Sequence, residues 1–279
     1  MRIASFEVAD RQSYGVVDGD RIHEASMALR SKYRDLRDVI AAGAVGRVAE
    51  DTGEAFGFGD VRFLPVIPDP DKILCVGVNY RPHIEEMGRE VPDYPVVFVR
   101  FPGSVVGHLQ PMLRPSVSGQ YDFEGELAVI IGKACRAAHR DTAMDFVAGY
   151  SCFMDGSIRD WQRHTPQFTA GKNFERSGAF GPWLVTADEI DDIRKVELAT
   201  RVSGELMQHA SVADLVFDIP ALIEYCSAFA RLVPGDVIVT GTPGGVGAAR
   251  TPPRWLQAGD SVEVDLGPIG TLANPVIDE

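Results

Sequence analysis

The stretch from Tyr121 to Gly132 constrains the fold of this chain more than any other. Its second half, Leu127-Ala128-Val129-Ile130-Ile131, is a continuous apolar run rich in branched residues and is closed by Gly132. Such a run predicts a buried strand. Its first half, Tyr121-Asp122-Phe123-Glu124-Gly125-Glu126, carries acidic residues at alternate positions. Because successive side chains of a strand point to opposite faces, these acids are expected on one face.

Glu124 and Glu126 form the part of this stretch that bears on chemistry. Two carboxylates side by side at the mouth of a buried strand repel each other unless a proton or a cation lies between them. Ligands made only of oxygen suit a hard divalent ion such as Mg²⁺, Mn²⁺ or Ca²⁺. The alternative is an edge strand whose acidic end is simply solvated. The pair alone leaves both interpretations open.

Asp155 is a candidate for a third ligand, because it ends another apolar run, Tyr150 to Met154. An aspartate in that place is also common as a helix cap or turn residue. Asp160 competes for the ligand role, and Asp122 is a candidate for a supporting position behind the ligands. Three carboxylates around one divalent ion would leave coordination positions for water and substrate.

His83 and Glu86 lie three residues apart, directly after a predicted buried strand. On a helical turn their side chains are neighbours, so the carboxylate can orient and polarise the imidazole. That pairing is typical of a general base. The alternative is a surface histidine with an incidental acidic neighbour.

Two further segments hold candidate substrate contacts. Lys172 stands among small and apolar residues, and it is either exposed to solvent or placed to meet an oxyanion or a substrate carboxylate. Thr242 belongs to the Gly-rich segment from Thr240 to Gly247 after a predicted strand. Its hydroxyl and the nearby backbone N–H groups would suit an anion, but the segment also fits an ordinary tight turn.

The composition excludes several classes of protein. Its 279 residues, 45% hydrophobic and 24% charged, are those of a globular protein with a sizeable core. A net charge of −13 argues against a nucleic-acid partner. No long apolar run and no signal-like N-terminus is present, so we expect a cytoplasmic protein without a membrane partner. Four scattered cysteines predict reduced thiols and no zinc site.

The elements divide the chain into two predicted units. Residues 1–66 combine short alternating strands with a helix at about 36–50, which predicts a small α+β domain. A proline-rich segment, Pro65 to Asp71, follows as a stiff linker. In residues 67–279 strands outnumber helices, and the clearest helix covers 218–231. We therefore expect a mixed, mainly β architecture with a few packed helices.

These segments, in the order in which they follow one another along the chain, together resemble the fumarylacetoacetate hydrolase (FAH) family. The resemblance runs from about Lys72 to the C-terminus, and six collinear blocks, with Lys172 between the fourth and the fifth, argue against a chance match. The motifs that carry it are Asn79-Tyr80-x-x-His83-x-x-Glu86-x-Gly88, Asp122-x-Glu124-Gly125-Glu126-Leu127-Ala128-Val129-x-Ile131-Gly132, Gly149-Tyr150 through Asp155, Ser157-x-Arg159-Asp160-x-Gln162, Lys172, Gly181-Pro182-Trp183, and Pro234-Gly235-Asp236-Val237-Ile238-x-Thr240-Gly241-Thr242-Pro243-x-Gly245-Val246-Gly247.

The resemblance implies a β-rich FAH-type catalytic domain behind a small N-terminal domain, usually in a homodimer, with Mg²⁺ or Mn²⁺ in the site. It implies that the metal ligands are Glu124, Glu126 and Asp155. His83 and Glu86 would lie on a loop that closes over the substrate.

The resemblance also assigns substrate contacts. Lys172 and Gln162 would contact the substrate or a developing oxyanion, and Thr242 would bind a substrate carboxylate. Arg100 stands where a lysine is common and would offer a planar fork to a carboxylate. The residues around Asp155 and after Lys172 also depart from the family pattern.

Members of this family act on small 2-oxo acids with a second carbonyl or carboxylate nearby. The expected reaction is metal-dependent hydrolysis of a C–C bond in an acylpyruvate-like β-diketo acid through an enolate. The alternatives are decarboxylation of an oxaloacetate-like acid, and isomerisation or hydration of an unsaturated 2-oxo-diacid. A non-catalytic protein that binds oxo acids is a further alternative, and the sequence does not decide the substrate.

Overall fold

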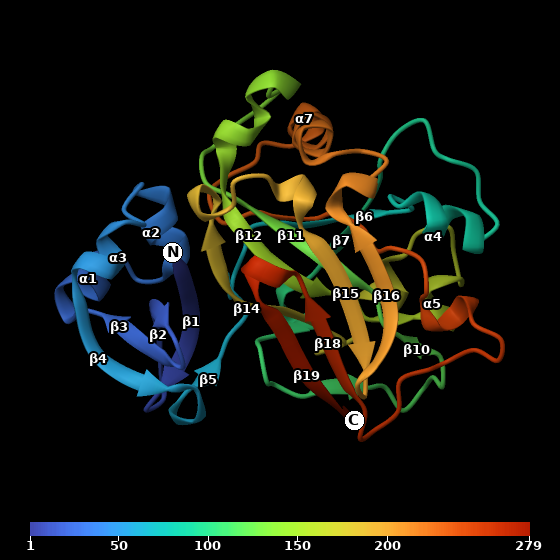
Figure 1. The fold of residues 1–279 in the computed structure, drawn as a ribbon, viewed down its shortest axis with the longest axis horizontal. Helices are drawn as coiled ribbons and strands as arrows, with labels where there is room; N and C mark the ends of the chain where they lie inside the picture. Colours follow the sequence, from blue (N-terminus) through green and yellow to red (C-terminus); the bar gives the residue numbers. More distant parts are fainter.

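A large mixed sheet organises the chain in the computed structural model, which describes all residues 1–279 (Figure 1). The strand order is β4-β3-β2-β1-β14-β12-β11-β17-β6-β7, and β5 and β8 pair with β1 and β14. The strands are β1 Arg2–Val8, β2 Arg11–Asp18, β3 Arg21–Ala25, β4 Thr52–Gly57, β5 Arg62–Phe63, β6 Ile73–Gly77, β7 Val96–Arg100, β8 Val105–Val106, β11 Gly125–Ile131, β12 Val147–Met154, β14 Gly178–Thr186 and β17 Val237–Val239. The predicted mainly β architecture is confirmed.

A second, five-stranded sheet packs against the large one, in the order β16-β15-β18-β19-β9 (Figure 1). Its strands contact β11, β12 and β14. The main hydrophobic core lies between the two sheets, with Leu127 and Val129 from one and Leu198 and Val264 from the other. The remaining strands are β9 Met112–Arg114, β15 Glu197–Val202, β16 Glu205–Ser211, β18 Ser261–Asp265, β19 Thr271–Asp278, and the separate pair β10 Tyr121–Asp122 and β13 Ser157–Ile158.

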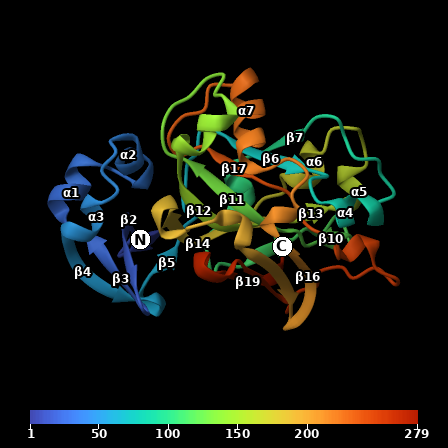
Figure 2. The same cartoon turned by 45° about the horizontal axis from the view of Figure 1, so that its top comes forward.

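Helices are short and cover the sheets at their edges (Figure 2). The predicted helix at 218–231 is confirmed as α7, and the Asp218 side chain caps it by accepting from the Ala221 N–H. The predicted helix at 36–50 is interrupted, because Gly43 adopts a left-handed φ of +63°. The helices are α1 Met27–Lys32, α2 Leu36–Ala41, α3 Arg47–Glu50, α4 Arg81–Glu86, α5 Arg159–Gln162, α6 Thr169–Lys172 and α7 Ile219–Phe229.

The N-terminal unit lies at one end of the molecule, where Figure 1 shows it in blue. Its sheet is continuous with the rest, because β1 pairs with β14 and Ile3 lies opposite Leu184. Ile3 and Tyr14 also share a buried cluster with Ala128 and Phe153. The division at residue 66 stays a prediction, and the two parts share both a sheet and a core.

The topology brings four strand ends to one place. β11 runs antiparallel to β12 and β17, and β17 runs parallel to β6. The start of β11 therefore lies beside the ends of β6, β12 and β17. The residues that precede β11 and follow the other three strands meet at this edge, and they include Glu124, Asp155 and Thr242.

None of the helices is long and apolar enough to cross a membrane.

His108 joins the N-terminal unit to the C-terminal strand. It is buried, its ring meets Phe63 edge-on at 5.1 Å between centroids, and its Nδ1 accepts from the Ala273 N–H at 3.1 Å. Burial lowers the pKa of His108 from 6.5 to about 4. The imidazole is therefore neutral in the folded protein at neutral pH.

We predict that this histidine makes folding depend on pH. Since the folded-state pKa lies below the unfolded value, the unfolded chain binds more protons between pH 6.5 and about pH 4. The contribution of neutral His108 to the free energy of unfolding should be complete above pH 6.5. It should fall by on the order of 3 kcal/mol as the pH drops to about 4. His108→Asn should flatten the profile across this window in urea unfolding. His139→Asn, at an exposed histidine, should follow the wild type; a parallel decline in His108→Asn would contradict the assignment.

Candidate metal centre and active site

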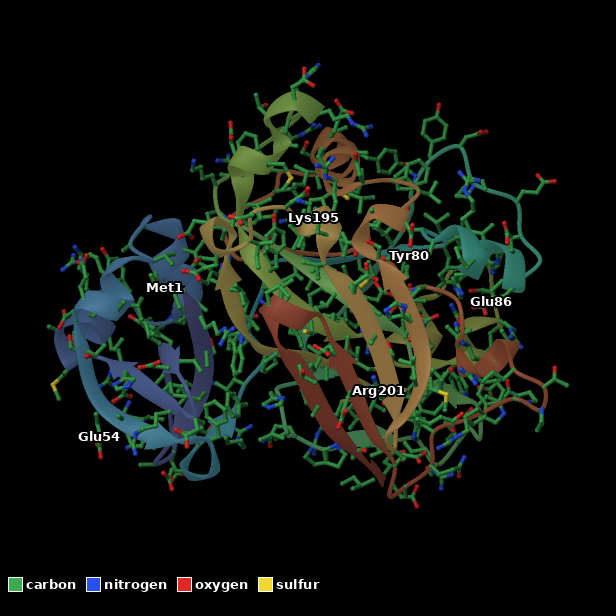
Figure 3. All side chains as sticks on the ribbon, viewed as in Figure 1. Met1, Glu54, Tyr80, Glu86, Lys195 and Arg201 are labelled. Atoms are coloured by element: carbon green, nitrogen blue, oxygen red, sulfur yellow. The ribbon has the colours of Figure 1, made fainter.

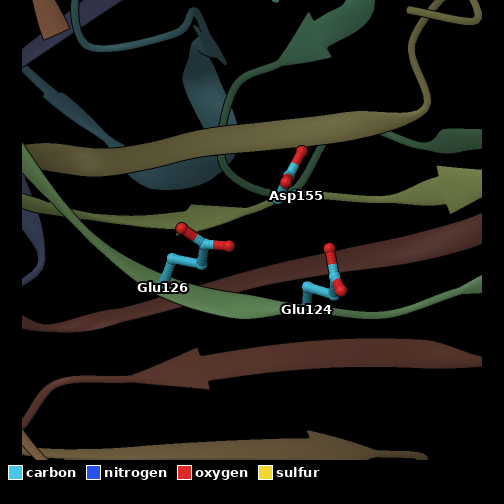
Figure 4. Close-up of side chains that lie close together, drawn as sticks. All are labelled: Glu124, Glu126 and Asp155. Atoms are coloured by element: carbon cyan, nitrogen blue, oxygen red, sulfur yellow. The ribbon is translucent and has the colours of Figure 1, made fainter. Parts of the chain in front are cut away.

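Three buried carboxylates converge at the shared strand edge (Figure 4). Glu124 precedes β11, Glu126 lies within it, and Asp155 follows β12. One oxygen from each lies within 4.8 Å of the others. The Asp155 N–H donates to the Glu124 carbonyl at 2.8 Å, which fixes the two segments side by side. The three predicted ligands are therefore brought together.

Asp122 lies outside the group of three ligands and supports it from behind. β10 pairs with β13 and ends at Asp122, whereas β11 begins at Gly125, so the chain changes partners between them. Its carboxylate accepts from Arg159 Nε at 2.7 Å and from the Gly247 N–H at 2.8 Å. Arg159 also donates to Glu124 Oε1 at 2.6 Å, so Asp122 lies behind Glu124. The other competitor, Asp160, accepts from Ser118 Oγ at 2.7 Å and lies outside the cluster.

Lys172 and Arg100 neutralise part of the cluster. The Lys172 ammonium is buried and contacts both Glu124 and Asp155. Arg100 Nη1 donates to Asp155 Oδ1 at 2.6 Å, and its Nη2 donates to Ser177 Oγ at 2.9 Å. The Arg100 side chain is fully buried and does not line the cavity, so it supports Asp155 and does not face a substrate. This placement differs from the predicted substrate contact, because the protein's own carboxylate takes up the guanidinium.

The charges of the centre do not cancel. Four buried carboxylates (Asp122, Glu124, Glu126, Asp155) face three buried cations (Arg100, Arg159, Lys172). Burial and then the neighbouring Asp155 and Glu124 carboxylates raise the pKa of Glu126 well above its usual value. Burial also opposes the charge of Glu124, but Arg159 and Lys172 outweigh it and lower its pKa. Glu126 is therefore the carboxylate of the centre whose charged form the protein compensates least.

This donor set fits a divalent cation. The ligand atoms are hard carboxylate oxygens. Together with Asp122, the carboxylates of the centre outnumber the three cations around them by one. Glu126 has no cationic side chain in contact, and its Oε2 accepts only from the Gly241 N–H at 2.6 Å. A divalent ion would neutralise the carboxylate that the protein leaves uncompensated.

The predicted His–Glu pair forms on α4. His83 is buried, and its Nδ1 lies 2.7 Å from Glu86 Oε1. Because a carboxylate only accepts, Nδ1 carries the proton and Nε2 is left as the basic nitrogen. Glu86 Oε2 accepts from the Gly245 N–H at 2.8 Å. Figure 3 labels Glu86 at the end of the molecule opposite Glu54 of the N-terminal unit.

The Gly-rich segment from Thr240 to Gly247 binds the protein's own carboxylates. Its N–H groups donate to three of them, Gly241 to Glu126, Gly245 to Glu86 and Gly247 to Asp122. The sequence left open an anion-binding loop or a plain turn. Within the chain, the anions that this loop binds are the carboxylates of Glu126, Glu86 and Asp122.

Thr242 and Gln208 fasten this loop to the start of β11. The Thr242 hydroxyl donates to the Gly125 carbonyl at 2.9 Å and accepts from Gln208 Nε2 at 2.8 Å. Gln208 Oε1 accepts from the Gly125 N–H at 3.0 Å. A substrate contact by Thr242 stays a prediction, and its hydroxyl has a structural role. Sequence reasoning missed Gln208, because a glutamine in a hairpin strand carries no motif.

One cavity of about 660 Å³ opens onto these groups. Of the residues predicted from the sequence, His83, Glu124, Glu126, Asp155, Gln162, Lys172 and Thr242 line it, whereas Glu86 and Arg100 do not. Gln162 accepts from Arg159 Nη1 at 2.9 Å, which orients its amide. The lining that sequence reasoning missed includes Arg159 and the aromatic rings of Phe98 and Phe168.

Comparison with known proteins assigns the family. Residues 72–277 match the family described as fumarylacetoacetate (FAA) hydrolase, C-terminal. The chain belongs to this family. Oxaloacetate tautomerase YisK of Bacillus subtilis is 41% identical over 225 residues, which cover 79% of this chain and 75% of that protein.

Two solved structures of the family are similar over the whole chain. Fumarylacetoacetate hydrolase from Exiguobacterium antarcticum has a TM-score of 0.88 and 34% identity, with 100% of both chains covered. Maleylpyruvate hydrolase from Sphingobium sp. SYK-6, in complex with manganese(II) and pyruvate, has a TM-score of 0.80 and 29% identity, with 100% of this chain and 99% of that chain covered. These relatives are enzymes, and this chain is an enzyme of the FAH family.

We predict opposite effects for the two glutamates. Glu126→Gln removes the uncompensated charge and keeps an acceptor for Gly241, so the metal-free protein should be at least as stable as the wild type. Glu124→Gln strips a charged partner from Arg159 and Lys172 and should lower stability by roughly 3 kcal/mol. Thermal unfolding with and without Mg²⁺ measures both. Mg²⁺ should raise the wild-type melting temperature and leave Glu126→Gln unchanged; equal stabilisation of both would show that Glu126 holds no ion.

A second prediction concerns Arg100. Arg100→Met leaves the buried Asp155 carboxylate without its guanidinium and should lower the free energy of unfolding by about 3–5 kcal/mol. Arg100→Lys keeps the charge but loses the fork that also reaches Ser177, so its loss should be smaller. Urea unfolding measures the difference, and a stability loss below about 1 kcal/mol in Arg100→Met would contradict the supporting role.

Proposed function

We propose that this enzyme catalyses the metal-dependent interconversion of keto and enol forms of a small 2-oxo acid of the oxaloacetate type. The observation that carries the proposal is one cavity in which a three-carboxylate floor faces His83, whose Nδ1 is held by Glu86 and whose Nε2 is free. The second histidine of the lining, His164, is exposed and packs its ring against Trp161. No serine or cysteine lines that cavity to act as a nucleophile. The arrangement suits proton transfer next to a carbonyl.

The residues of the chain divide the work. An ion held by Glu124, Glu126 and Asp155 would act as a Lewis acid toward the carboxylate and 2-oxo oxygens of the substrate. His83 Nε2 takes a proton from the carbon next to the 2-oxo group, and Glu86 stabilises the imidazolium through Nδ1. The imidazolium then gives the proton to the 2-oxo oxygen, which completes the enol, and the reverse sequence regenerates the keto form. Lys172 contributes positive charge at the floor, where negative charge develops.

Hydrolysis of a C–C bond in an acylpyruvate-like acid is the second candidate. It uses the same histidine, which then takes its proton from water. The similarity to maleylpyruvate hydrolase favours it, at 29% identity. The 41% identity to an oxaloacetate tautomerase supports tautomerisation more strongly, and decarboxylation or isomerisation of related acids would draw on the same site. Mg²⁺ or Mn²⁺ as the native ion, a homodimer and a cytoplasmic location stay predictions.

A substrate panel separates these reactions. Oxaloacetate, acylpyruvates and hydroxymuconate-type diacids are offered with Mg²⁺, with Mn²⁺ and after chelation. We expect fast loss of the enol absorbance of oxaloacetate and metal-dependent incorporation of deuterium at the carbon beside the 2-oxo group in D₂O. Pyruvate release from acylpyruvates faster than this exchange would instead favour hydrolysis, and release of CO₂ from oxaloacetate at that rate would favour decarboxylation.

His83→Gln should lower the rate of tautomerisation by about 10²–10⁴-fold, because the base is lost. Glu86→Gln should have a smaller effect, since Gln still accepts from Nδ1 but does not stabilise the imidazolium. Both variants should keep the Mg²⁺-induced rise in melting temperature, which shows that the metal end is intact. His209→Gln, at an exposed histidine outside the cavity, is the matched control. A rate in His83→Gln equal to that of the control would remove His83 from the mechanism.

A further inference from the structure

Two arginines at the mouth of the cavity, Arg89 and Arg163, have no partner within the chain. Both side chains line the cavity and are exposed, and neither makes an ion pair or a hydrogen bond. Other arginines of the chain also lack an ion pair, but these two are the unpaired ones that line the cavity. Unpaired guanidinium groups beside a site for anionic substrates are therefore candidates for binding an anion.

The fold places Arg89 beside the catalytic helix. α4 ends in a Schellman motif, in which the Gly88 N–H donates to the Glu85 carbonyl and the Arg89 N–H donates to the Ile84 carbonyl, both at 3.0 Å. Gly88 supplies the left-handed φ of +62° that this motif requires. The Arg89 guanidinium then lies 5.8 Å from the centre of the Phe168 ring, a cation–π contact that holds it at the cavity wall.

Arg163 is attached to the floor of the cavity through its own helix. It follows α5, which contributes Arg159 and Gln162 to the floor, and its N–H donates to the Asp160 carbonyl at 3.1 Å. Trp161 of the same helix packs edge-on against Phe174 at 5.1 Å between centroids. The backbone of Arg163 is thus fixed relative to the carboxylates, while its side chain stays exposed.

The half-buried part of the lining is mostly apolar, with Gln162 as its polar side chain. Val96, Phe98, Met87 and Phe168 are half-buried, in contrast to the buried carboxylates and the exposed arginines. The cavity volume of about 660 Å³ lies in the range that holds a drug-sized ligand and exceeds what a four-carbon acid fills. From inside outward the lining therefore runs from oxygen ligands through an apolar section to positive charge.

We propose that Arg89 and Arg163 form a second anion subsite, which binds the distal carboxylate of a 2-oxo dicarboxylic acid whose 2-oxo end lies at the carboxylate floor. The subsite selects diacids with an apolar or unsaturated spacer over monoacids of equal length. The inference rests on the proposed function for the position of the 2-oxo end. It assigns specificity to two residues that carry out no proton transfer.

Binding tests this without turnover. 2-Oxoadipate and 2-oxohexanoate have the same chain length and differ in a terminal carboxylate against a methyl group. Calorimetry with Mg²⁺-loaded enzyme should give a Kd at least about tenfold lower for the diacid. The double variant Arg89→Gln/Arg163→Gln should bring this ratio close to one and leave the Kd of 2-oxohexanoate unchanged. Added salt should also reduce the wild-type ratio, because the mouth is exposed.

Arg47→Gln removes an equally unpaired, exposed arginine of the N-terminal unit and should keep the wild-type ratio. A wild-type ratio near one, or a ratio that survives in the double variant, would overturn the subsite. Either result leaves the proposed function standing if 2-oxohexanoate still binds in a Mg²⁺-dependent way. Absence of Mg²⁺-dependent binding by both acids would overturn the subsite and the proposed function together.

Discussion

The excess of buried negative charge at the start of β11 is the constraint on which the rest of the site depends. Four carboxylates are held out of water within one cluster, and such burial is costly unless the charges are paired with cations, which the protein supplies for three of the four. The partners come from different elements, Arg100 from the end of β7, Arg159 from α5 and Lys172 from α6. Each ion pair therefore also fixes the position of a segment that lines or supports the cavity.

The loop after β17 extends this control to the catalytic base. Its backbone N–H groups hold Glu126 of the metal centre, Glu86 of the His–Glu pair and Asp122 behind Arg159. Of these three carboxylates, only Glu86 lies on the short helix α4. Its hydrogen bond from the Gly245 N–H connects that helix directly to the loop. The position of the His83 imidazole at the cavity is thus set by the same loop that orients Glu126, a proposed metal ligand.

Sequence patterns were sufficient where the chemistry is local. Alternation along a strand placed Glu124 and Glu126 together, and helical spacing paired His83 with Glu86. Alternation also put Asp122 near this pair, and it shares Arg159 with Glu124. The change of strand partner between β10 and β11 has no signature in residue types. Arg100 shows a second limit, since a sequence gives the sign of its charge but not which carboxylate it meets.

Features that depend on distant segments were not predictable from spacing. Gln208 joins β16 to Gly125 across 83 positions of sequence, and the pairing of β1 with β14 joins residue 3 to residue 184. Neither contact involves a motif, because the pairing of β1 with β14 is between backbone groups and the partner of the Gln208 side chain is the backbone N–H of Gly125. Every residue except proline offers a backbone N–H and a carbonyl. The resemblance to a family implied all three ligands at once. A set of motifs in the family's order implies the same fold, and therefore the same long-range contacts, although no single motif shows which residues meet.

The charge of the centre also explains how a strongly acidic protein can take an anionic substrate. The chain has a net charge of −13, which repels anions at a distance. A divalent ion would change the sum over the four carboxylates and three cations of the centre from minus one to plus one. With the unpaired arginines at the mouth, the cavity then presents positive charge at both ends and an apolar wall between them. A cavity with low-dielectric walls concentrates that field locally, so the acidic surface keeps other anions away without closing the site to a substrate that spans both ends.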